Sequence, residues 1–316
     1  MRARRSWSTA RMPTTEALAG EPPPANALRA VLGALCGHDD GRLFALLDGA
    51  RIRNLSVMLR ELAVPALGLY RVGADEALGH VMPAIARVSL PGPLPLWLAV
   101  GAEMLENTVF VIAAASLEEL QTHFRRLLLV LDPRGARNYL RFYDARVLPP
   151  LLEGSTEIER ARIFGPVEAF LVLEGRAPDG TPTFRELRRP AAGPADIRPP
   201  SATDPLRLSE RHEAVLAKDA IARYDARCVR WLREQFPAPL QARTDADVER
   251  IVVRARTLGP LLGLEVGRDV TTLAEALVLG FGADDEAEVR RAVARERRTV
   301  LEGIRDRLAA RPPAAP

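Results

Sequence analysis

Hydrophobic residues between about positions 43 and 175 fall into short apolar runs that alternate with amphipathic stretches. Apolar runs of this length, bounded by Gly, Asn or Asp, are typical of buried strands, and apolar residues three or four apart are typical of helices. The predicted strands are residues 43–48, 66–72, 108–115 and 167–175, with two more inside 127–144 around the turn Asp132-Pro133-Arg134-Gly135. The predicted helices are residues 52–62, 94–104, 116–128, 145–154 and 155–164.

The helix expected over residues 116–128 carries its own start signal. Ser116 stands three residues before Glu119, which is the spacing of a capping box. In that arrangement each side chain accepts a hydrogen bond from an otherwise unpaired backbone amide of the first helical turn. Residues 176–184, which include Asp179-Gly180, are expected to form a hairpin turn.

After about residue 206 the pattern becomes helical throughout, with apolar residues on one side and charged residues on the other. Helices are predicted over residues 213–235, 245–263, 271–281 and 284–308. In the first of these, Trp231 belongs to the apolar stripe, and it is interpreted as a core residue.

The fold class that follows is a mixed α/β (α+β) protein with two lobes. An N-terminal lobe with a mixed sheet and flanking helices precedes an all-helical C-terminal lobe. The expected boundaries are a disordered leader at 1–25, an α/β domain at 26–190, a Pro-rich linker at 191–205, a helical lobe at 206–309 and a disordered tail at 310–316.

Charge and composition narrow the possible functions. The formal net charge is +3, and Lys218 is the only lysine, so almost every basic residue is Arg. A GC-rich genome explains this bias, and Asp and Glu are mixed among the arginines, so we expect no nucleic-acid binding; arginines gathered on one face would favour it instead. Cys36 and Cys228 have no metal-ligand spacing and fit a reducing compartment.

No apolar run is long enough to span a bilayer, and the basic start MRARRSWSTARMP is not followed by the apolar stretch of a secretory signal. We therefore expect no membrane insertion and a cytoplasmic protein. Met12 is an alternative start to Met1.

The usual catalytic and cofactor motifs are absent from the sequence, so no catalytic residue, metal or cofactor is predicted. No histidine stands in a metal-binding spacing, no serine lies in a GxSxG elbow, and no glycine-rich phosphate loop is present. The residues considered were His38, His80, His123, His212, Ser56, Ser89, Ser116, Gly259, Gly263 and Gly267. The three glycines, with Pro260, are interpreted as punctuation between helices.

Two aspartates remain as candidate chemical groups. Asp48 and Asp144 each follow a strand-like run, at the position where catalytic groups often lie in α/β proteins. The favoured interpretation is that each caps a following helix. Catalysis by the pair is an alternative, and so is an ion pair with Arg51 or Arg146.

An ordered set of segments resembles a known family. The segments are LFALLDGAR (43–51), LGLYRV (67–72), MPAIARV (82–88), residues 116–148 and IFGPVEAFLV (163–172), and the most specific is the capped helix, the hairpin and RFYDARVL (141–148). Together they resemble the adaptor or chaperone domain of bacterial type VI secretion systems. The family often has Pro where this chain has Ala145, which relaxes the start of the following helix.

The resemblance implies a non-enzymatic protein without a cofactor that binds a secreted effector in the cytoplasm and helps to load it onto the VgrG spike. The implied partners are the VgrG spike protein and the cognate effector, with the α/β lobe docking the spike and the helical lobe holding the effector. The family-signature residues, which contribute to the fold or to a partner contact, are Asp48, Tyr70, Arg141, Phe142, Tyr143, Asp144 and Arg146.

Two further interpretations concern Trp97 and the pair of aspartates. Trp97 follows a Pro-rich turn and is a candidate partner contact, because aromatic residues anchor interfaces. The alternative function is an Asp-dependent hydrolase that uses Asp48 and Asp144, which requires the two carboxylates within about 10 Å in a solvent-filled cleft.

Overall fold

The computed structural model describes residues 23–70, 81–190, 205–261 and 268–278 of the chain. Several sequence-based predictions lie outside these residues. They are the leader up to residue 22, residues 71–72 of one strand, most of the linker, the helix over 284–308 and the tail, and also His80, Gly263 and Gly267.

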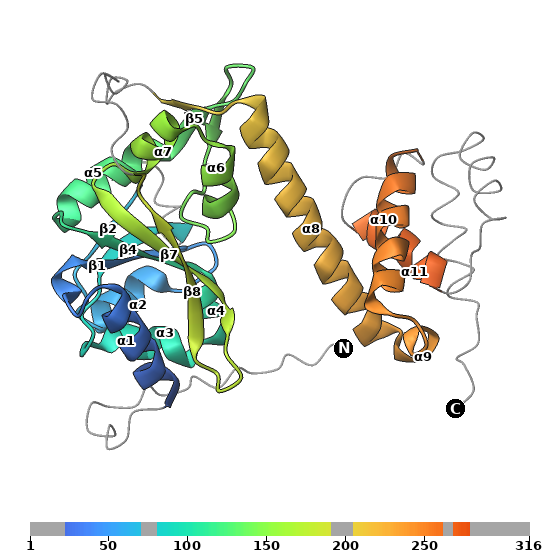
Figure 1. Cartoon of the computed structure of the whole chain (residues 1–316), viewed down its shortest axis with the longest axis horizontal. Coiled ribbons are helices and arrows are strands. Elements are labelled where there is room, and N and C mark those ends of the chain that lie inside the picture. Colours follow the sequence, from blue (N-terminus) through green and yellow to red (C-terminus); the bar gives the residue numbers. More distant parts are fainter. Residues whose placement is uncertain (1–22, 71–80, 191–204, 262–267, 279–316) are drawn as a thin grey trace, which may run out of the picture. The chain divides into compact units, whose positions relative to one another are not determined.

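A six-stranded sheet organises the first part of the chain (Figure 1). Each neighbouring pair in it is antiparallel; at the centre, Ala45 lies opposite Ala86 on one side and Phe110 on the other. In spatial order the strands are β2 (Ala66–Gly68), β3 (Ala84–Arg87), β1 (Leu43–Leu47), β4 (Thr108–Ala113), β7 (Val167–Arg176) and β8 (Pro182–Arg188).

Helices cover both faces of this sheet, so its central strands are apolar on both sides. Alternate residues of a strand point to opposite faces. Phe44 and Leu46 of β1 belong to one hydrophobic cluster, while Leu43, Ala45 and Leu47 belong to another. This explains why β1 and β4 read as unbroken apolar runs although antiparallel strands more often alternate with polar residues.

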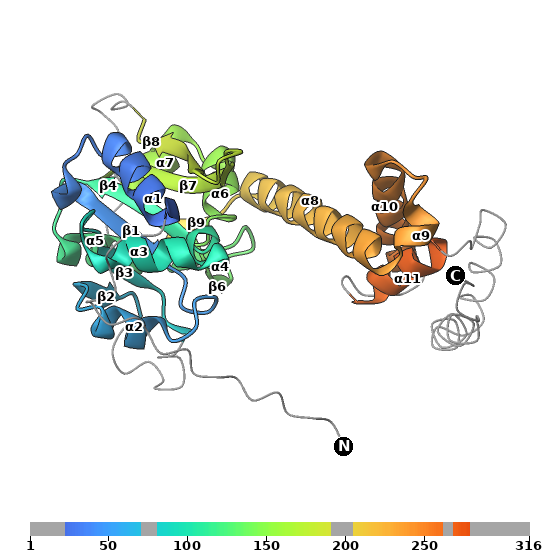
Figure 2. The ribbon, with the colours of Figure 1, turned by 90° about the horizontal axis from the view of Figure 1, so that it is seen from below.

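One face packs against four helices, and the other against three. The first set is α1 (Pro23–Leu35), α2 (Leu55–Glu61), α3 (Pro93–Val100) and α4 (Ala102–Glu106). The second set is α5 (Leu117–Leu127), α6 (Leu148–Gly154) and α7 (Glu157–Phe164). Helix α1 lies against α3, where Arg29 donates to the carbonyl oxygen of Gly92 at 3.0 Å (Figure 2).

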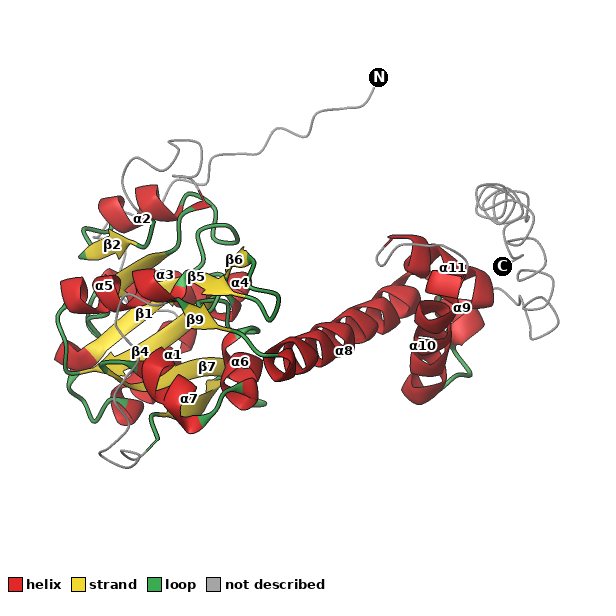
Figure 3. Cartoon of the chain, turned by 90° about the horizontal axis from the view of Figure 1, so that it is seen from above, coloured by secondary structure: helices red, strands yellow, loops and turns green. Residues whose placement is uncertain are grey.

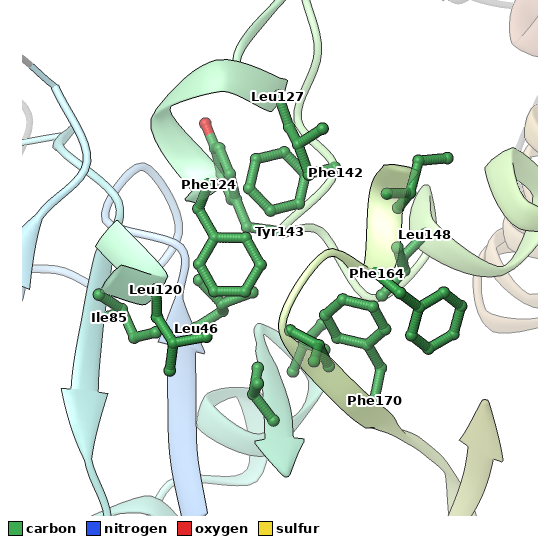
Figure 4. Close-up of a cluster of buried hydrophobic side chains, with 14 of the residues drawn as sticks. Leu46, Ile85, Leu120, Phe124, Leu127, Phe142, Tyr143, Leu148, Phe164 and Phe170 are labelled. Atoms are coloured by element: carbon green, nitrogen blue, oxygen red, sulfur yellow. The ribbon is translucent and has the colours of Figure 1, made fainter. Parts of the chain in front are cut away.

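Aromatic rings fill the core beneath α5, α6 and α7 (Figure 4). Phe124 stacks on Phe142 with ring centroids 5.4 Å apart, and Phe170 of β7 lies 6.4 Å from Phe124 and 5.0 Å from Phe164. These rings come from α5, the 141–147 turn, α7 and the sheet, so this core joins segments far apart in sequence.

The chain also forms a small second sheet of three strands. Its antiparallel hairpin consists of β5 (Leu129–Leu131) and β6 (Arg137–Tyr139), and β9 (Leu206–Arg207) pairs in parallel with β5.

The remaining described residues are helical (Figure 3). The helices are α8 (Glu210–Gln235), α9 (Pro237–Leu240), α10 (Asp245–Leu261) and α11 (Arg268–Val278). The chain divides into two units between Leu216 and Ala217, inside α8. In the second unit the core contains Leu232, Val248, Val252 and Val270. Arg233 holds the connection after α9 by donating to Asp245, to the Leu240 carbonyl and to the Arg243 carbonyl.

The predicted fold class is confirmed: an antiparallel sheet with flanking helices is followed by a helical region. The capping box of Ser116 and Glu119 is present at the start of α5, and the hairpins around 132–135 and 177–181 have formed. Trp231 packs against the helical core, with its ring 6.2 Å from that of Phe236.

Several predicted boundaries were wrong. Helix α1 begins at Pro23, inside the expected leader, and Gly101 divides the helix expected over 94–104 into α3 and α4. Residues Leu206–Arg207, expected in the helical lobe, form β9 of the small sheet. Helix α10 continues through Gly259 and Pro260 to Leu261, so these two residues do not separate helices.

The start of α8 is fixed by a buried histidine that takes the place of the usual capping-box carboxylate. His212 is fully buried, and its Nδ1 accepts a hydrogen bond from the Ser209 amide at 3.0 Å. An amide can only donate, so the ring proton is on Nε2, which donates to Ser155 Oγ at 3.0 Å; that hydroxyl in turn donates to the Leu151 carbonyl. The neutral imidazole therefore ties the first turn of α8 to the end of α6.

Burial lowers the pKa of His212, and the Arg211 charge acts in the same direction against the opposing effect of Glu159. A histidine whose pKa is lowered by folding stabilises the fold fully above its unfolded pKa of about 6.5, and this contribution is lost as the pH falls through the folded pKa. We expect the free energy of unfolding to fall between pH 7 and 5 by up to about 1.4 kcal/mol per pH unit from this one group.

His212→Gln tests this expectation by chemical denaturation across that pH range. Glutamine keeps an acceptor for the Ser209 amide but does not titrate. The variant should therefore show a flatter pH dependence than the wild type, and an unchanged slope would contradict the role given to His212.

Candidate functional site

Two buried carboxylates lie where the sheet gives way to its connecting loops. Asp48 directly follows β1 and is 1% exposed, and Asp144 lies in the turn before α6 and is 6% exposed. A buried charge is costly unless it is paired and hydrogen-bonded. The surrounding residues supply both kinds of compensation.

Asp144 is held by the residue two positions later in the chain. Its Oδ1 accepts from the Arg146 amide at 2.9 Å and from Arg146 Nε at 2.8 Å, while its Oδ2 accepts from a terminal nitrogen of the same guanidinium at 2.7 Å. This two-pronged arrangement is the strongest geometry for an arginine–carboxylate pair.

Asp48 is held by residues from two separate parts of the chain. Its Oδ1 accepts from the Ala50 amide at 3.1 Å, and its Oδ2 accepts a short hydrogen bond from Arg141. The adjoining Gly49 passes so close to the segment before β3 that a Cβ there would lie 2.1 Å from the Met82 carbonyl oxygen. Any side chain at position 49 would therefore push this turn away from the sheet.

Arg51 lies between the two carboxylates. Its Nε is 3.8 Å from Asp48 Oδ2 and 3.9 Å from Asp144 Oδ2. These are ion-pair distances and exceed a hydrogen bond. One guanidinium thus links the loop after β1 electrostatically with the turn before α6. We refer to Asp48, Asp144, Arg51, Arg141 and Arg146 as the Asp–Arg cluster.

Three tyrosines lie in contact with one another beside the Asp–Arg cluster. The Arg141 guanidinium lies over the ring of the buried Tyr143, 5.9 Å from its centroid, and Tyr143 hydrogen-bonds to Tyr70. The Tyr70 ring meets that of Tyr139 edge to face at 5.6 Å. These contacts therefore connect β6, the 141–147 turn and the residues after β2.

Helix α5 fixes the backbone on which Tyr70 stands. Arg125 donates to the carbonyl oxygens of Gly68, Leu69 and Tyr70 at 3.1–3.2 Å, and Gln121 donates to Gly68 at 2.7 Å. These bonds satisfy carbonyl groups at the end of an edge strand that no neighbouring strand can reach.

The electrostatics of the Asp–Arg cluster favour the ionised form of Asp144. Burial by itself opposes the ionisation of Asp144, but hydrogen bonds from the Arg146 side chain and amide outweigh it and hold the pKa of Asp144 below its usual value. The charge and hydrogen bond of Asp48 likewise outweigh burial and raise the pKa of Arg141. Burial and the hydrogen bond with Tyr70 raise the pKa of Tyr143, so its phenol stays neutral.

The helix-capping interpretation of the two aspartates was wrong. The N-cap of α6 is Val147 and that of α2 is Asn54, and neither helix has a side-chain cap. Each aspartate instead accepts from an amide two residues ahead, which closes a local turn, and pairs with arginine. The alternative interpretation, ion pairs with Arg51 and Arg146, is the one that the structure supports.

The local structure of RFYDARVL also differs from the prediction. Strand β6 ends at Tyr139, and residues 141–147 form turns, so the segment is no strand. Phe142 and Tyr143 were expected on opposite faces, but both are buried in the same core cluster. The turn allows this, because consecutive side chains alternate only in a strand.

Six of the signature residues come together: Asp48, Arg141, Tyr143, Asp144, Arg146 and Tyr70. Phe142 lies inward of them, in the aromatic core. Trp97 does not join them. It is half-buried in α3 against the cluster on the opposite face of the sheet, so its role as a partner contact stays a prediction.

Sequence reasoning missed three residues that the site depends on. Arg125 and Gln121 had no local signal, since both are ordinary polar positions of an amphipathic helix. Tyr139 was missed because it stands at the end of a short strand, and its contact with Tyr70 joins residues far apart in the chain.

The described residues contain no group of three or more His, Cys, Asp or Glu side chains placed to bind a metal ion. Nor does any helix among them combine the length and the apolar character needed to cross a bilayer. The groups of the Asp–Arg cluster that solvent can reach belong to its three arginines. Their side chains are 31–42% exposed, and their guanidinium groups can donate hydrogen bonds to anionic groups.

The comparison with known proteins places this site inside a recognised domain. A family model described as "Domain of unknown function (DUF4123)" matches residues 43–162, which include the whole Asp–Arg cluster. No curated protein and no solved structure matches the chain.

Replacement of Asp144 by asparagine should destabilise the fold clearly. The change removes a buried charge that faces two guanidiniums, so Arg146 loses this carboxylate and Arg51 keeps only its long ion pair with Asp48. Breaking a buried pair costs about 3–5 kcal/mol, and because these arginines are partly exposed we expect about 2–4 kcal/mol in the free energy of unfolding. Urea denaturation at pH 7 measures this change.

Asp132→Asn is the matched control. Asp132 also accepts two amide hydrogen bonds, from Arg134 and Ala136, but it lies at an exposed turn, so we expect a loss below about 1 kcal/mol. Equal losses in the two variants would show that turn closure, and not the buried ion pair, is what Asp144 contributes.

Proposed function

We propose that this chain is a non-enzymatic adaptor that binds a type VI secretion effector in the cytoplasm and promotes its loading onto the VgrG spike. The observation that carries the proposal is the arrangement of the Asp–Arg cluster within the matched domain. Its acidic groups are buried and paired, whereas its arginines and the neighbouring Tyr139 reach the surface. Such a cluster is suited to shaping and charging a docking surface.

The resemblance of residues 42–175 to type VI secretion adaptors indicates which partners to expect. In this proposal the α/β unit docks the VgrG spike protein and the helical unit holds the effector. The second unit has features that suit a binding role. Ile221 and Val253 are exposed apolar residues on its helices, and a hollow at the start of α10 is lined by Arg243, Asp247, Arg250, Ile251 and Arg254.

The alternative function, an Asp-dependent hydrolase, fits this geometry less well. The two carboxylates are close enough to share Arg51, as that function requires. General acid catalysis needs a carboxyl group that keeps its proton near neutral pH, which desolvation without a cation produces. Arginine pairing has the opposite effect on Asp144, and burial of both groups leaves little room for an attacking water.

Deletion of the gene tests the proposed function in a host that secretes the effector encoded beside it. We expect the effector to disappear from the culture supernatant and to remain in the cells, while secretion of the spike and of effectors encoded elsewhere continues. Immunoblotting of both fractions measures this, and complementation with the intact gene is the control.

Purified components test the same proposal directly. The chain should form a complex with that effector, and with the spike protein, on size-exclusion chromatography at physiological salt. Unchanged secretion after deletion, together with no complex in either mixture, would overturn the adaptor function.

A further inference from the structure

The Asp–Arg cluster contains more arginine side chains than carboxylates. Three guanidiniums, from Arg51, Arg141 and Arg146, face the two carboxylates of Asp48 and Asp144. Counted over the described members of the cluster, the positive charges exceed the negative by one, at a place where the arginine side chains are 42%, 39% and 31% exposed. We refer to these three residues as the arginine face.

Two members of the arginine face have hydrogen-bond donors to spare. Within the described part of the chain, the Arg51 side chain makes only the two long ion pairs and no hydrogen bond. Arg141 uses one terminal nitrogen on Asp48, and its other terminal nitrogen makes no hydrogen bond among the described residues; its Nε is also unpaired there but is buried. A guanidinium has five N–H donors, so the terminal N–H groups of both side chains can donate to a further anionic oxygen without releasing the buried aspartates.

An exposed apolar patch continues from the arginine face. Tyr139 is 54% exposed and Leu129 is 49% exposed, and the two are direct cross-strand partners in the β5–β6 hairpin. Residues opposite each other in an antiparallel pair point to the same side. Tyr139 contacts Tyr70, which interacts with the buried Tyr143 beneath Arg141, so a chain of ring contacts connects the patch with the arginines.

We propose that the arginine face, with Tyr139 and Leu129 beside it, binds an acidic segment of a protein partner. A carboxylate of that segment lies between Arg51 and Arg141, and a neighbouring apolar side chain packs on Tyr139 and Leu129. Arginine and tyrosine are the residue types most enriched among energetically dominant interface positions. This inference deepens the adaptor proposal and rests on it only for the identity of the partner.

The charge pattern favours an acidic peptide over a nucleic acid. A phosphate backbone is bound through many cations, each of which releases counterions. Here, among the described residues of the cluster, buried carboxylates balance two of the three positive charges, which leaves an excess of one. One excess charge with an adjoining apolar patch matches a carboxylate beside a hydrophobic side chain.

Fluorescence anisotropy with three labelled probes tests the charge preference: hexaglutamate, hexalysine and a single-stranded oligothymidine. The intact chain should bind hexaglutamate in a salt-dependent way and should not bind hexalysine. Arg51→Gln should weaken hexaglutamate binding about tenfold, as expected for the loss of a charged hydrogen-bond donor. Its thermal unfolding midpoint should fall only slightly, because the Arg51 side chain makes no hydrogen bond within the described residues and its two ion pairs are long.

Arg53→Gln is the matched control. Arg53 is exposed on the same loop, and its substitution removes the same charge. Within the described residues it makes no ion pair with the cluster, so we expect less than a twofold change in hexaglutamate affinity. Equal weakening by both substitutions, or no binding of hexaglutamate by the wild type, would overturn the proposal. So would tighter binding of oligothymidine that Arg51→Gln abolishes, because the face would then be a nucleic-acid site.

A second peptide isolates the apolar contribution. Replacing two central glutamates of the probe by leucines should strengthen binding to the intact chain despite the lower charge. Tyr139→Ser should remove that gain and leave hexaglutamate binding unchanged. If Tyr139→Ser weakens both peptides equally, the tyrosine is not part of an apolar subsite.

The same variants separate this proposal from the adaptor function. If Arg51→Gln loses the acidic peptide but retains full affinity for both the effector and the spike, the arginine face is not the docking surface and the adaptor function stands. If the wild type binds hexaglutamate but neither protein, the peptide site stands and the adaptor function fails.

Discussion

Burial of Asp48 and Asp144 is the constraint on which the functional end of the α/β unit depends. Two carboxylates nearly withdrawn from water require cations at short range, because neither can stay ionised in an apolar surrounding without them. Arg141 reaches back to the end of β1 from a turn 93 residues later, and Arg51 lies between the two carboxylates. The loop after β1 and the turn before α6 are therefore positioned by the same set of charges.

The doubly covered sheet makes this constraint possible. An antiparallel sheet with one wet face would leave the residue after β1 in solvent, where an aspartate needs no partner. Here α1 to α4 cover one face and α5 to α7 the other, so the chain leaves β1 inside the protein. The 141–147 turn then has to provide both an aromatic core residue, Phe142, and a cation, Arg141, within two positions.

Much of the fold could be predicted from sequence, because its signals are local. The apolar runs of β1 and β4, the capping box at Ser116 and the turn at Asp132 each lie within a few residues, and all are present. Helix α1 was missed since its start, Pro23, stands in a proline run that resembles a disordered leader. Proline is well tolerated in the first helical turn, so the same residues permit both interpretations.

The candidate site was predictable only as a set of residues and not as an arrangement. Asp48, Asp144, Arg51 and Arg146 were recognised as chemical groups, yet helix capping was preferred to ion pairing. The reason is physical: capping is decided by neighbours in the sequence, whereas the Arg141–Asp48 pair depends on how distant turns meet. Tyr139 and Arg125 carried no local signal at all, because their partners, Tyr70 and the carbonyls around Leu69, lie more than 50 residues away.

The same arginines can serve both the fold and a partner because their two sides face different surroundings. On the inner side, hydrogen bonds from Arg141 and Arg146 neutralise carboxylates that the fold has buried. On the outer side, Arg51 and Arg141 keep donors exposed, and holding the aspartates restricts the guanidiniums in advance. A side chain that is already fixed loses less conformational entropy when it binds, which is the general advantage of a preorganised interface. The buried aspartates thus orient a cationic surface without contacting the partner themselves.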